Sequence, residues 1–270
     1  MSNLRVLYVT SEILPFLEIT RAANFVRQLP QGLQAKGVEV RILMPRFGCI
    51  NERKNRLHEV VRLSGINITV GDEEKPLTIK VASIPNARLQ VYFLDNDDYF
   101  ERKFALTDDK NKFYNDNDER AIFFCKGALE TIKKLGWSPD IIHCHDWMTS
   151  LIPLYLKTTY KNDPVFKTSK AVFSINNSEF KHKFNKNIIQ KAKMRDVTDE
   201  MLTLFQTGDF NGFVKIGIEY ADAICLADKA LTESVKSLLK SFTKKKKLGF
   251  MEEDRAVESY FNFYNEILLS

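Results

Sequence analysis

A polar segment at residues 143–147 carries the side chains of this chain that are best suited to chemistry. It reads His-Cys-His-Asp-Trp and follows an apolar run that starts at Ile141. His143 and His145 stand two positions apart, so on an extended chain they point the same way and a metal site can be considered. The chain holds only 4 histidines and offers no identifiable third ligand. We therefore expect no metal at this segment.

Two interpretations of the segment stay open on spacing alone. In one, a histidine is a core residue whose ring is hydrogen-bonded to a backbone carbonyl. In the other, His145 and Asp146 reach a polar cleft at the carboxyl end of a strand and bind sugar hydroxyls there. These two side chains are the best catalytic candidates, and no residue is assigned a catalytic role.

Polar side chains also follow two other apolar runs. Glu12 and Glu18 flank the loop after the first run, where two carboxylates could form an acid/base pair but are more often solvated. Asn176 and Asn177 end a later run and could bind hydroxyls, although turns are their commoner setting. The six aspartates at residues 95, 97, 98, 108, 109 and 116 indicate a cation or a basic partner only weakly. The chain has no glycine-rich phosphate loop and no G-x-S-x-G motif, and we expect no cofactor.

Strand and helix patterns alternate along the chain and predict an α/β fold with a doubly wound, mostly parallel, Rossmann-like sheet. We expect strands at residues 6–9, 38–44, 59–63, 66–70, 77–84, 89–94, 141–144, 171–175 and 223–227. We expect helices at residues 25–33, 118–135, 149–159, 213–220 and 229–239. Residues 95–118 are expected to form an ordered surface loop beside the sheet edge, and residues 181–195 to form surface helices and loops.

The chain divides into three segments. Residues 1–240 form one large domain, residues 241–251 a lysine-rich linker, and residues 252–270 a C-terminal helix. In the last segment, apolar residues recur at helical spacing: Ala256, Tyr260, Phe263, Tyr264 and Ile267. Because three acidic residues stand at its start, where negative charge is favourable, we expect this helix to form and to dock back on the large domain.

Composition is that of an ordinary soluble globular protein. The 270 residues are 44% hydrophobic and 28% charged, with a net charge of +5. No apolar run approaches the ~20 residues of a membrane span, and the N-terminus enters a strand directly. Of the four scattered cysteines, three lie in or beside apolar runs and are expected to be buried thiols in a reducing compartment. We expect a cytoplasmic protein that binds neither nucleic acid nor membrane. The lysine run at residues 244–247 is most simply a solvated linker, with contact to an anionic surface as the alternative.

In order and spacing, these segments resemble the N-terminal catalytic domain of bacterial glycogen and starch synthases. The resemblance covers residues 1 to about 240. The family's opening strand matches LRVLYVTSE at residues 4–12, its H-x-H-D-W motif matches residues 143–147, and the segment before its last strand matches KIGIEYAD at residues 215–222. The resemblance implies the N-terminal half of a retaining GT-B glycosyltransferase, which uses ADP-glucose to extend an α-1,4-glucan.

The departures from the family fall on functional positions. The family's first loop reads K-x-G-G-L-A-D-V, and its lysine and glycines receive the nucleotide sugar. Here Glu18 replaces the lysine and reverses the charge that would face a diphosphate. Thr20 and Arg21 replace the two glycines, adding side chains where a backbone must approach a ligand. Asn24 replaces the aspartate, and Asn176 replaces the histidine of the T-I-H-N segment.

In the family, most of the donor site lies in a second, C-terminal domain, for which we expect no room in this chain. The helix at residues 252–270 resembles the family's own terminal helix, which crosses back onto the N-terminal domain. The resemblance therefore suggests a synthase from which the donor domain has been excised while its last helix was kept.

Three functional hypotheses remain open. The first is a synthase-family protein reduced to its acceptor-side domain, without autonomous transferase activity, that binds α-glucan or regulates an enzyme. The second is a glycosyltransferase subunit completed by a partner chain that supplies the donor half. The third is a protein-interaction module with no sugar chemistry. The ligands implied are α-glucan or ADP-glucose, and the partners implied are a second copy of this chain or a full-length synthase.

Overall fold

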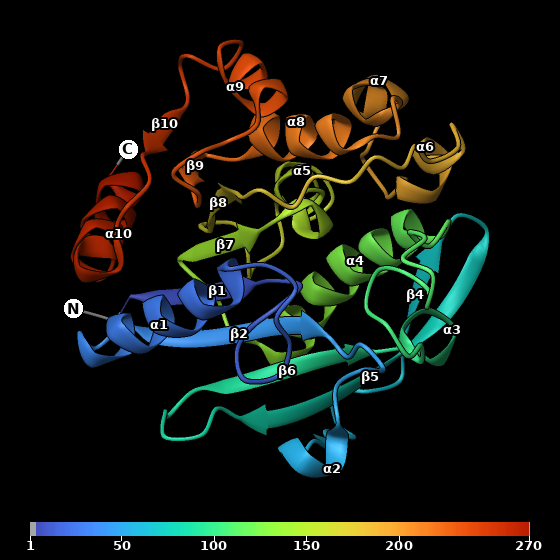
Figure 1. Ribbon diagram of the computed structural model, residues 1–270, viewed down its shortest axis with the longest axis horizontal. Coiled ribbons are helices and arrows are strands. Elements are labelled where there is room, and N and C mark those ends of the chain that lie inside the picture. The colour runs from blue at the N-terminus through green and yellow to red at the C-terminus, as the bar shows by residue number, and fades with distance from the viewer. Residues whose placement is uncertain (1–3, 270) are drawn as a thin grey trace.

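A ten-stranded sheet runs through the computed structural model, which describes residues 4–269 (Figure 1). Its strands are β1 (Arg5–Val9), β2 (Glu39–Pro45), β3 (His58–Glu59), β4 (Ile66–Val70), β5 (Glu73–Ser83), β6 (Gln90–Asp95), β7 (Ile141–His145), β8 (Lys170–Ile175), β9 (Ala223–Leu226) and β10 (Lys246–Leu248). Their order is β10-β9-β8-β7-β1-β2-β6-β5-β3, with β4 paired to β5. From β10 to β6 all neighbours are parallel, whereas β3, β4 and β6 pair antiparallel with β5. The predicted fold class is confirmed.

Helices cover both faces of the sheet, as its buried parallel strands require. The helices are α1 (Ala22–Ala35), α2 (Glu52–Asn55), α3 (Asp97–Phe100), α4 (Asn117–Leu135), α5 (Ile152–Lys157), α6 (Ile188–Ala192), α7 (Asp199–Leu202), α8 (Phe210–Tyr220), α9 (Glu233–Leu239) and α10 (Glu253–Leu268), with 3-10 turns η1 (Trp147–Thr149) and η2 (Thr203–Phe205). The helices α1 and α10 cover one face of the sheet, which is the face to which the His143 side chain points. On the other, α8 approaches β8 so closely that a Cβ at Gly217 would lie 2.8 Å from the Phe173 ring.

The structure differs from the predicted elements at several boundaries. The strand predicted at residues 59–63 is wrong beyond Glu59, because residues 60–64 form a turn closed by backbone hydrogen bonds to the Val60 carbonyl. The helix predicted at residues 149–159 is split into η1 and the shorter α5. The helix predicted from residue 229 begins only at Glu233, where the Thr232 side chain accepts the amide of Val235 and caps it.

The lysine-rich segment at residues 241–251 is more than a linker, because it contains β10 at the end of the sheet. The ammonium group of Lys245 donates to the Ala221 carbonyl at 2.7 Å. Lys246 forms an ion pair with Glu266 of α10 at 3.4 Å. The expectation of a wholly solvated lysine run is therefore wrong for Lys245 and Lys246.

The C-terminal helix α10 packs back on the sheet domain through α1 (Figure 1). A Cβ at Gly32 of α1 would lie 2.3 Å from a methyl group of Val257. The two helices are therefore packed too closely at this point for a side chain larger than that of glycine. Further along, Tyr260 lies 5.5 Å, centroid to centroid, from the ring of Phe25. The buried residues of α10 are the ones that the helical spacing singled out.

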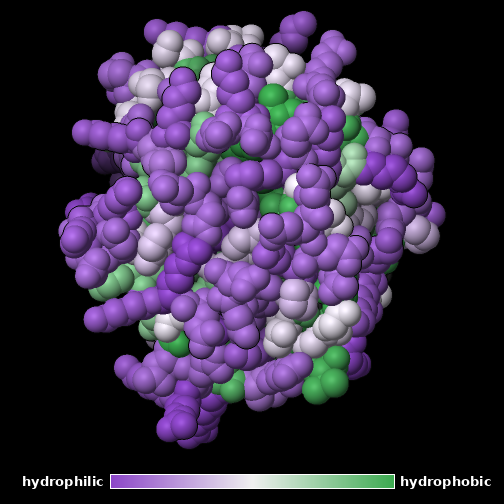
Figure 2. All heavy atoms as spheres, turned by 90° about the vertical axis from the view of Figure 1, so that its right-hand side faces the viewer, coloured by the Kyte–Doolittle hydropathy of each residue, from purple (hydrophilic) through white to green (hydrophobic). Residues whose placement is uncertain are grey.

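The surface seen in Figure 2, on the side of α3, β4 and α6, is largely hydrophilic, with hydrophobic residues in small separate patches. Within residues 4–269, no helix has both the length and the apolar character needed to cross a membrane. Cys125, Cys144 and Cys225 are buried, as expected, whereas Cys49 is exposed.

Candidate functional site

A cleft of about 580 Å³ opens where the loops after β1, β7 and β8 meet. This is the edge of a parallel sheet at which ligands usually bind. The charged side chains that line it are all carboxylates: Glu12, Glu18, Asp146 and Glu179. The aromatic side chains that line it are Phe104, Phe113, Trp147 and Phe180. The cleft therefore combines hydrogen-bond acceptors with apolar ring surfaces.

Asp146 turns the chain from β7 into the cleft. Its φ of 68° lies in the left-handed region, which few residues other than glycine adopt. One carboxylate oxygen accepts the Ser11 hydroxyl, and the other accepts the amide of Met148 at 2.7 Å. Burial raises the pKa of Asp146 to about 7, against the opposing effect of these two donors. The carboxyl group can therefore change its charge near neutral pH.

Of the predicted pair, Asp146 lines the cleft, whereas His145 lies beneath it and is 3% exposed. The His145 ring stacks on His143, with 4.1 Å between ring centroids, and on Tyr8 at 5.6 Å. Burial lowers the pKa of His145 to about 3, so the ring is neutral at physiological pH. Its Nε2 has no hydrogen-bond partner within residues 4–269.

His143 is a satisfied core histidine, but its partners are side chains rather than a backbone carbonyl. Its Nδ1 lies 2.6 Å from the Tyr264 hydroxyl and its Nε2 lies 2.7 Å from the Ser174 hydroxyl. Tyr264 also bonds the Tyr8 hydroxyl at 2.8 Å. Burial, together with the neighbouring His145, holds the pKa of His143 well below its usual value. The two histidines do point the same way, as the spacing predicted.

Glu12 organises the loop that leads into α1. Its carboxylate accepts the backbone amides of Ile19 and Thr20, at 2.5 and 2.6 Å, and the Thr20 hydroxyl at 2.5 Å. Burial raises the pKa of Glu12, whereas the bonds from Thr20 and Ile19 oppose that shift. Because an internal carboxylate occupies these two amides, they are not free to bind an external anion.

The four loop positions expected from the sequence to depart from the family's pattern divide into those that line the cleft and those that do not. Glu18 and Thr20 line the cleft, and Glu18 places a carboxylate there. Arg21 precedes α1 and does not line the cleft. Asn24 points to the C-terminal helix instead, where its amide donates to Glu253 at 3.1 Å.

The two asparagines after β8 have different roles. Asn176 is buried, and its side-chain oxygen accepts the Ser178 hydroxyl at 3.2 Å. Asn177 lines the cleft, but its backbone amide donates to Asp228 at 2.5 Å and its side chain donates to the carbonyl of Ala230. The segment after β8 is therefore tied to the loop after β9.

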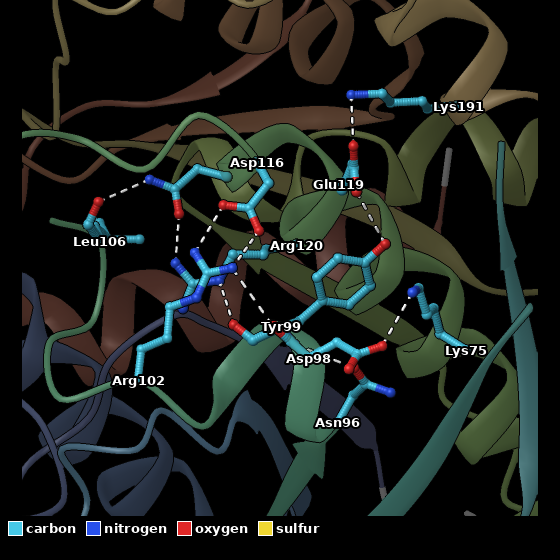
Figure 3. A network of polar contacts seen from close by, with 11 residues as sticks. Lys75, Asn96, Asp98, Tyr99, Arg102, Leu106, Asp116, Glu119, Arg120 and Lys191 are labelled. Atoms are coloured by element: carbon cyan, nitrogen blue, oxygen red, sulfur yellow. Dashed lines mark hydrogen bonds and ion pairs between the residues drawn. The ribbon is translucent and has the colours of Figure 1, made fainter. Parts of the chain in front are cut away.

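One wall of the cleft was not foreseen, because it combines aromatic residues from separate loops. Residues 99–107 supply part of it and are held by a polar network (Figure 3). Arg102 pairs with both carboxylate oxygens of Asp116, with 2.8 Å between Nη1 and Oδ1. Arg120 and Asn117 donate to two backbone carbonyls of the loop, at 2.7 and 2.8 Å. The mixed polar and aromatic composition of residues 95–118 was the signal available in the sequence.

Four of the seven aspartates in residues 95–118 form ion pairs with cations of this chain. Asp95 lies 2.9 Å from both Arg46 and Lys80, and Asp116 is bonded to Arg102. Within residues 4–269, no cluster of three or more histidine, cysteine, aspartate or glutamate side chains could hold a metal ion. The aspartates thus order a loop of the cleft wall.

Comparison with known proteins gives a consistent picture. A family model described as the starch synthase catalytic domain matches residues 5–243. The glycogen synthase of Chlorobium limicola is 39% identical over 234 residues, which cover 86% of this chain and 47% of that protein. The glycogen synthase of Chlorobium chlorochromatii is 42% identical over 215 residues, covering 75% and 43% respectively. The chain thus spans about half the length of these relatives.

A solved structure supports the fold independently of close sequence identity. The catalytic domain of starch synthase IV from Arabidopsis thaliana, bound to ADP and acarbose, superposes with a TM-score of 0.77. The two chains are 21% identical, and the match covers 93% of this chain and 52% of that chain.

Proposed function

The chain belongs to the starch synthase catalytic domain family, and from that premise we propose that it is a glucan-binding domain without transferase activity of its own. The observation that carries this proposal is the charge of the cleft. Its charged lining consists of four carboxylates, which repel a diphosphate and accept hydrogen bonds from neutral sugar hydroxyls. The cleft therefore suits a glucan better than a nucleotide sugar.

The loop before α1 supports the same conclusion. Glu18 adds negative charge to the cleft, and the amides of Ile19 and Thr20 are already bonded to Glu12. A phosphate-binding loop instead presents free amides and positive charge. In this loop two of the amides are occupied by Glu12 and a further carboxylate, Glu18, lines the cleft, whereas Arg21 at the start of α1 does not line it.

Aromatic side chains supply the apolar part of the proposed glucan site. Phe104 is 37% exposed at the cleft, and Ile19, another of its lining residues, is 38% exposed. Exposed apolar side chains that are grouped in a cleft indicate a ligand site more often than apolar side chains scattered singly over the surface. The matched Arabidopsis structure was bound to both ADP and acarbose, so a nucleotide and a glucan are the two ligands to compare.

Calorimetric titration of the purified chain tests the proposal. We expect heat of binding with maltoheptaose and none with ADP-glucose. Phe104→Ala should weaken maltoheptaose binding about tenfold, equivalent to ~1.4 kcal/mol of lost apolar contact. Phe250→Ala, which removes a ring outside the cleft, serves as the matched control and should leave the affinity unchanged. Binding of ADP-glucose that persists in high salt, or no binding of maltoheptaose, would overturn the proposal.

The second candidate is a transferase subunit completed by another chain. The observation in its favour is that Asp146 still lines the cleft within an intact His-x-His-Asp-Trp segment. This function predicts transfer from ADP-glucose only after a partner has supplied the donor half. Both candidate functions use the same acceptor cleft. They differ in whether the loop at Glu18 allows the diphosphate of ADP-glucose to bind.

A further inference from the structure

A second groove, unlike the cleft in charge, lies between α9 and β10. It has a volume of about 580 Å³. Its apolar side chains are Leu226, Leu231, Leu239 and Phe250. Its lysines are Lys229, Lys236, Lys240 and Lys247. We call this surface the lysine groove.

Two of the four lysines are already paired. Lys229 lies 3.5 Å from Glu252, and Lys236 lies 2.7 Å from Glu233 one helical turn away. Lys240 and Lys247 are exposed, and neither side chain has an ion-pair or hydrogen-bond partner within residues 4–269. The groove therefore holds two lysines without a bonded partner beside its apolar side chains.

The single acidic residue in the groove, Asp228, offsets part of this positive charge but forms no ion pair with Lys240 or Lys247 within residues 4–269. Its carboxylate accepts the backbone amide of Asn177 at 2.5 Å. The lysine run at residues 244–247 thus serves two purposes. Lys245 and Lys246 are bonded inside the fold, whereas Lys247 faces the groove.

We infer that the lysine groove is a docking site for an acidic, amphipathic segment of a partner protein. The apolar floor selects a segment with aliphatic side chains, and the free ammonium groups select flanking carboxylates. Flexible anions without an apolar face would leave the half-buried Leu226 and Phe250 in contact with water. The inference goes beyond the proposed glucan binding and does not depend on it.

The groove is joined to the cleft by hydrogen bonds. Asn177 donates to Asp228 and Ala230, and Ser234 of α9 donates to Glu179 at 3.3 Å. Because Asn177 and Glu179 line the cleft, a segment docked in the lysine groove would lie beside the cleft opening.

Fluorescence anisotropy with synthetic peptides of about 15 residues tests the inference. The probe is a labelled helix-forming peptide with leucines at i, i+3, i+4 and i+7 and glutamates between them. We expect binding that weakens between about 50 mM and 300 mM salt. Lys240→Glu/Lys247→Glu should lower the affinity at least ~tenfold, since two attractive pairs become repulsive. Lys161→Glu/Lys167→Glu changes the charge equally at exposed lysines outside the groove and should change the affinity less than about twofold.

Two further probes distinguish a docked amphipathic segment from an anion held by charge alone. A peptide with serine in place of leucine should bind at least ~tenfold more weakly, and Phe250→Ala should weaken the leucine peptide. Equal binding of the serine peptide, tighter binding to vesicles of anionic lipid or to single-stranded DNA, or equal losses in the two double-lysine variants would overturn the inference. Maltoheptaose affinity, measured on the same samples, reports on the cleft separately.

Discussion

Asp146 combines features that each cost stability at a single position. Its side chain is buried, its φ is positive, and burial raises the pKa of its carboxyl group to about 7. With its ψ of 177°, this backbone conformation is one that residues other than glycine rarely adopt. Under the proposed function the carboxyl group at this position has a role, because it can accept hydrogen bonds from glucan hydroxyls.

The first prediction concerns the pH dependence of stability at Asp146. Because its pKa is raised in the folded state above the ordinary value of 3.8, the folded protein holds a proton that the unfolded chain has released. Its contribution to the free energy of unfolding therefore falls as pH rises from about 4 to 7. Asp146→Asn removes that loss. We expect the variant to equal wild type at about pH 4 and to exceed it by on the order of 2 kcal/mol at about pH 8.

Thermal melts of both proteins across this pH range measure the difference. Asp109→Asn, at an exposed residue outside the cleft, is the control and should show no pH-dependent gain. In the Asp146→Asn variant, maltoheptaose binding should weaken, because the amide cannot accept as many hydroxyl hydrogen bonds as the carboxylate. A variant less stable than wild type at high pH would contradict the prediction.

The second prediction concerns the charge at Glu18. Glu18→Lys replaces repulsion of a diphosphate by attraction at the cleft. We expect ADP affinity to rise about tenfold at low salt, with the gain lost at high salt. Glu101→Lys, at an exposed position outside the cleft, makes the same change in net charge. Calorimetry that shows equal gains in the two variants would mean that overall charge, rather than Glu18, excludes the nucleotide.

At the level of elements, the apolar runs of the parallel strands were enough to predict most of the sheet. The short edge strand β10 was not predicted, because it lies in a run of lysines and is held by pairing with β9. The depth of His145 could not be predicted either, since strand alternation gives a direction but not what covers the side chain. Residues such as Phe104 and Phe180 meet only in the folded chain. The sequence therefore predicted the residues of the candidate site that follow the strands, but not the aromatic residues that form its walls.

The third prediction tests how α10 is held to the sheet. Tyr264→Phe removes the hydroxyl that bonds both Tyr8 and His143. Leaving buried polar groups without a partner costs about 1–3 kcal/mol, so we expect a lower thermal midpoint. Tyr220→Phe, at a half-buried tyrosine of α8, should leave the midpoint unchanged.

Deletion of residues 250–270 extends this test to the whole element. It would expose the apolar surface that α10 covers on α1 and the buried tyrosine and histidine rings, so the loss should exceed that of the single substitution. Equal midpoints for the deleted and intact chains would show that α10 does not stabilise the sheet domain.

Across the whole molecule, opposite charges are collected on two neighbouring surfaces. The cleft gathers carboxylates and the lysine groove gathers ammonium groups, although the net charge of the chain is only +5. The two surfaces meet at the bond between Asn177 and Asp228. A diffusing anion is therefore attracted to the groove and repelled from the cleft, whereas a neutral glucan would meet no electrostatic penalty there. Any weak, salt-sensitive binding of ADP should accordingly be lost in the Lys240→Glu/Lys247→Glu variant.

The last prediction distinguishes a glucan-binding domain without transferase activity from a transferase subunit. The chain spans about half the length of its glycogen synthase relatives, so the C-terminal half of the Chlorobium limicola enzyme can be supplied as a second chain. We expect no glucose transfer from ADP-glucose to maltoheptaose by this mixture, because Glu18 and the occupied amides of Ile19 and Thr20 oppose the diphosphate. The N-terminal half of the same relative, mixed with its own second half, is the positive control. If that control is active, transfer by the mixture with this chain would establish the subunit function, whereas its absence, together with maltoheptaose binding, would leave the glucan-binding domain.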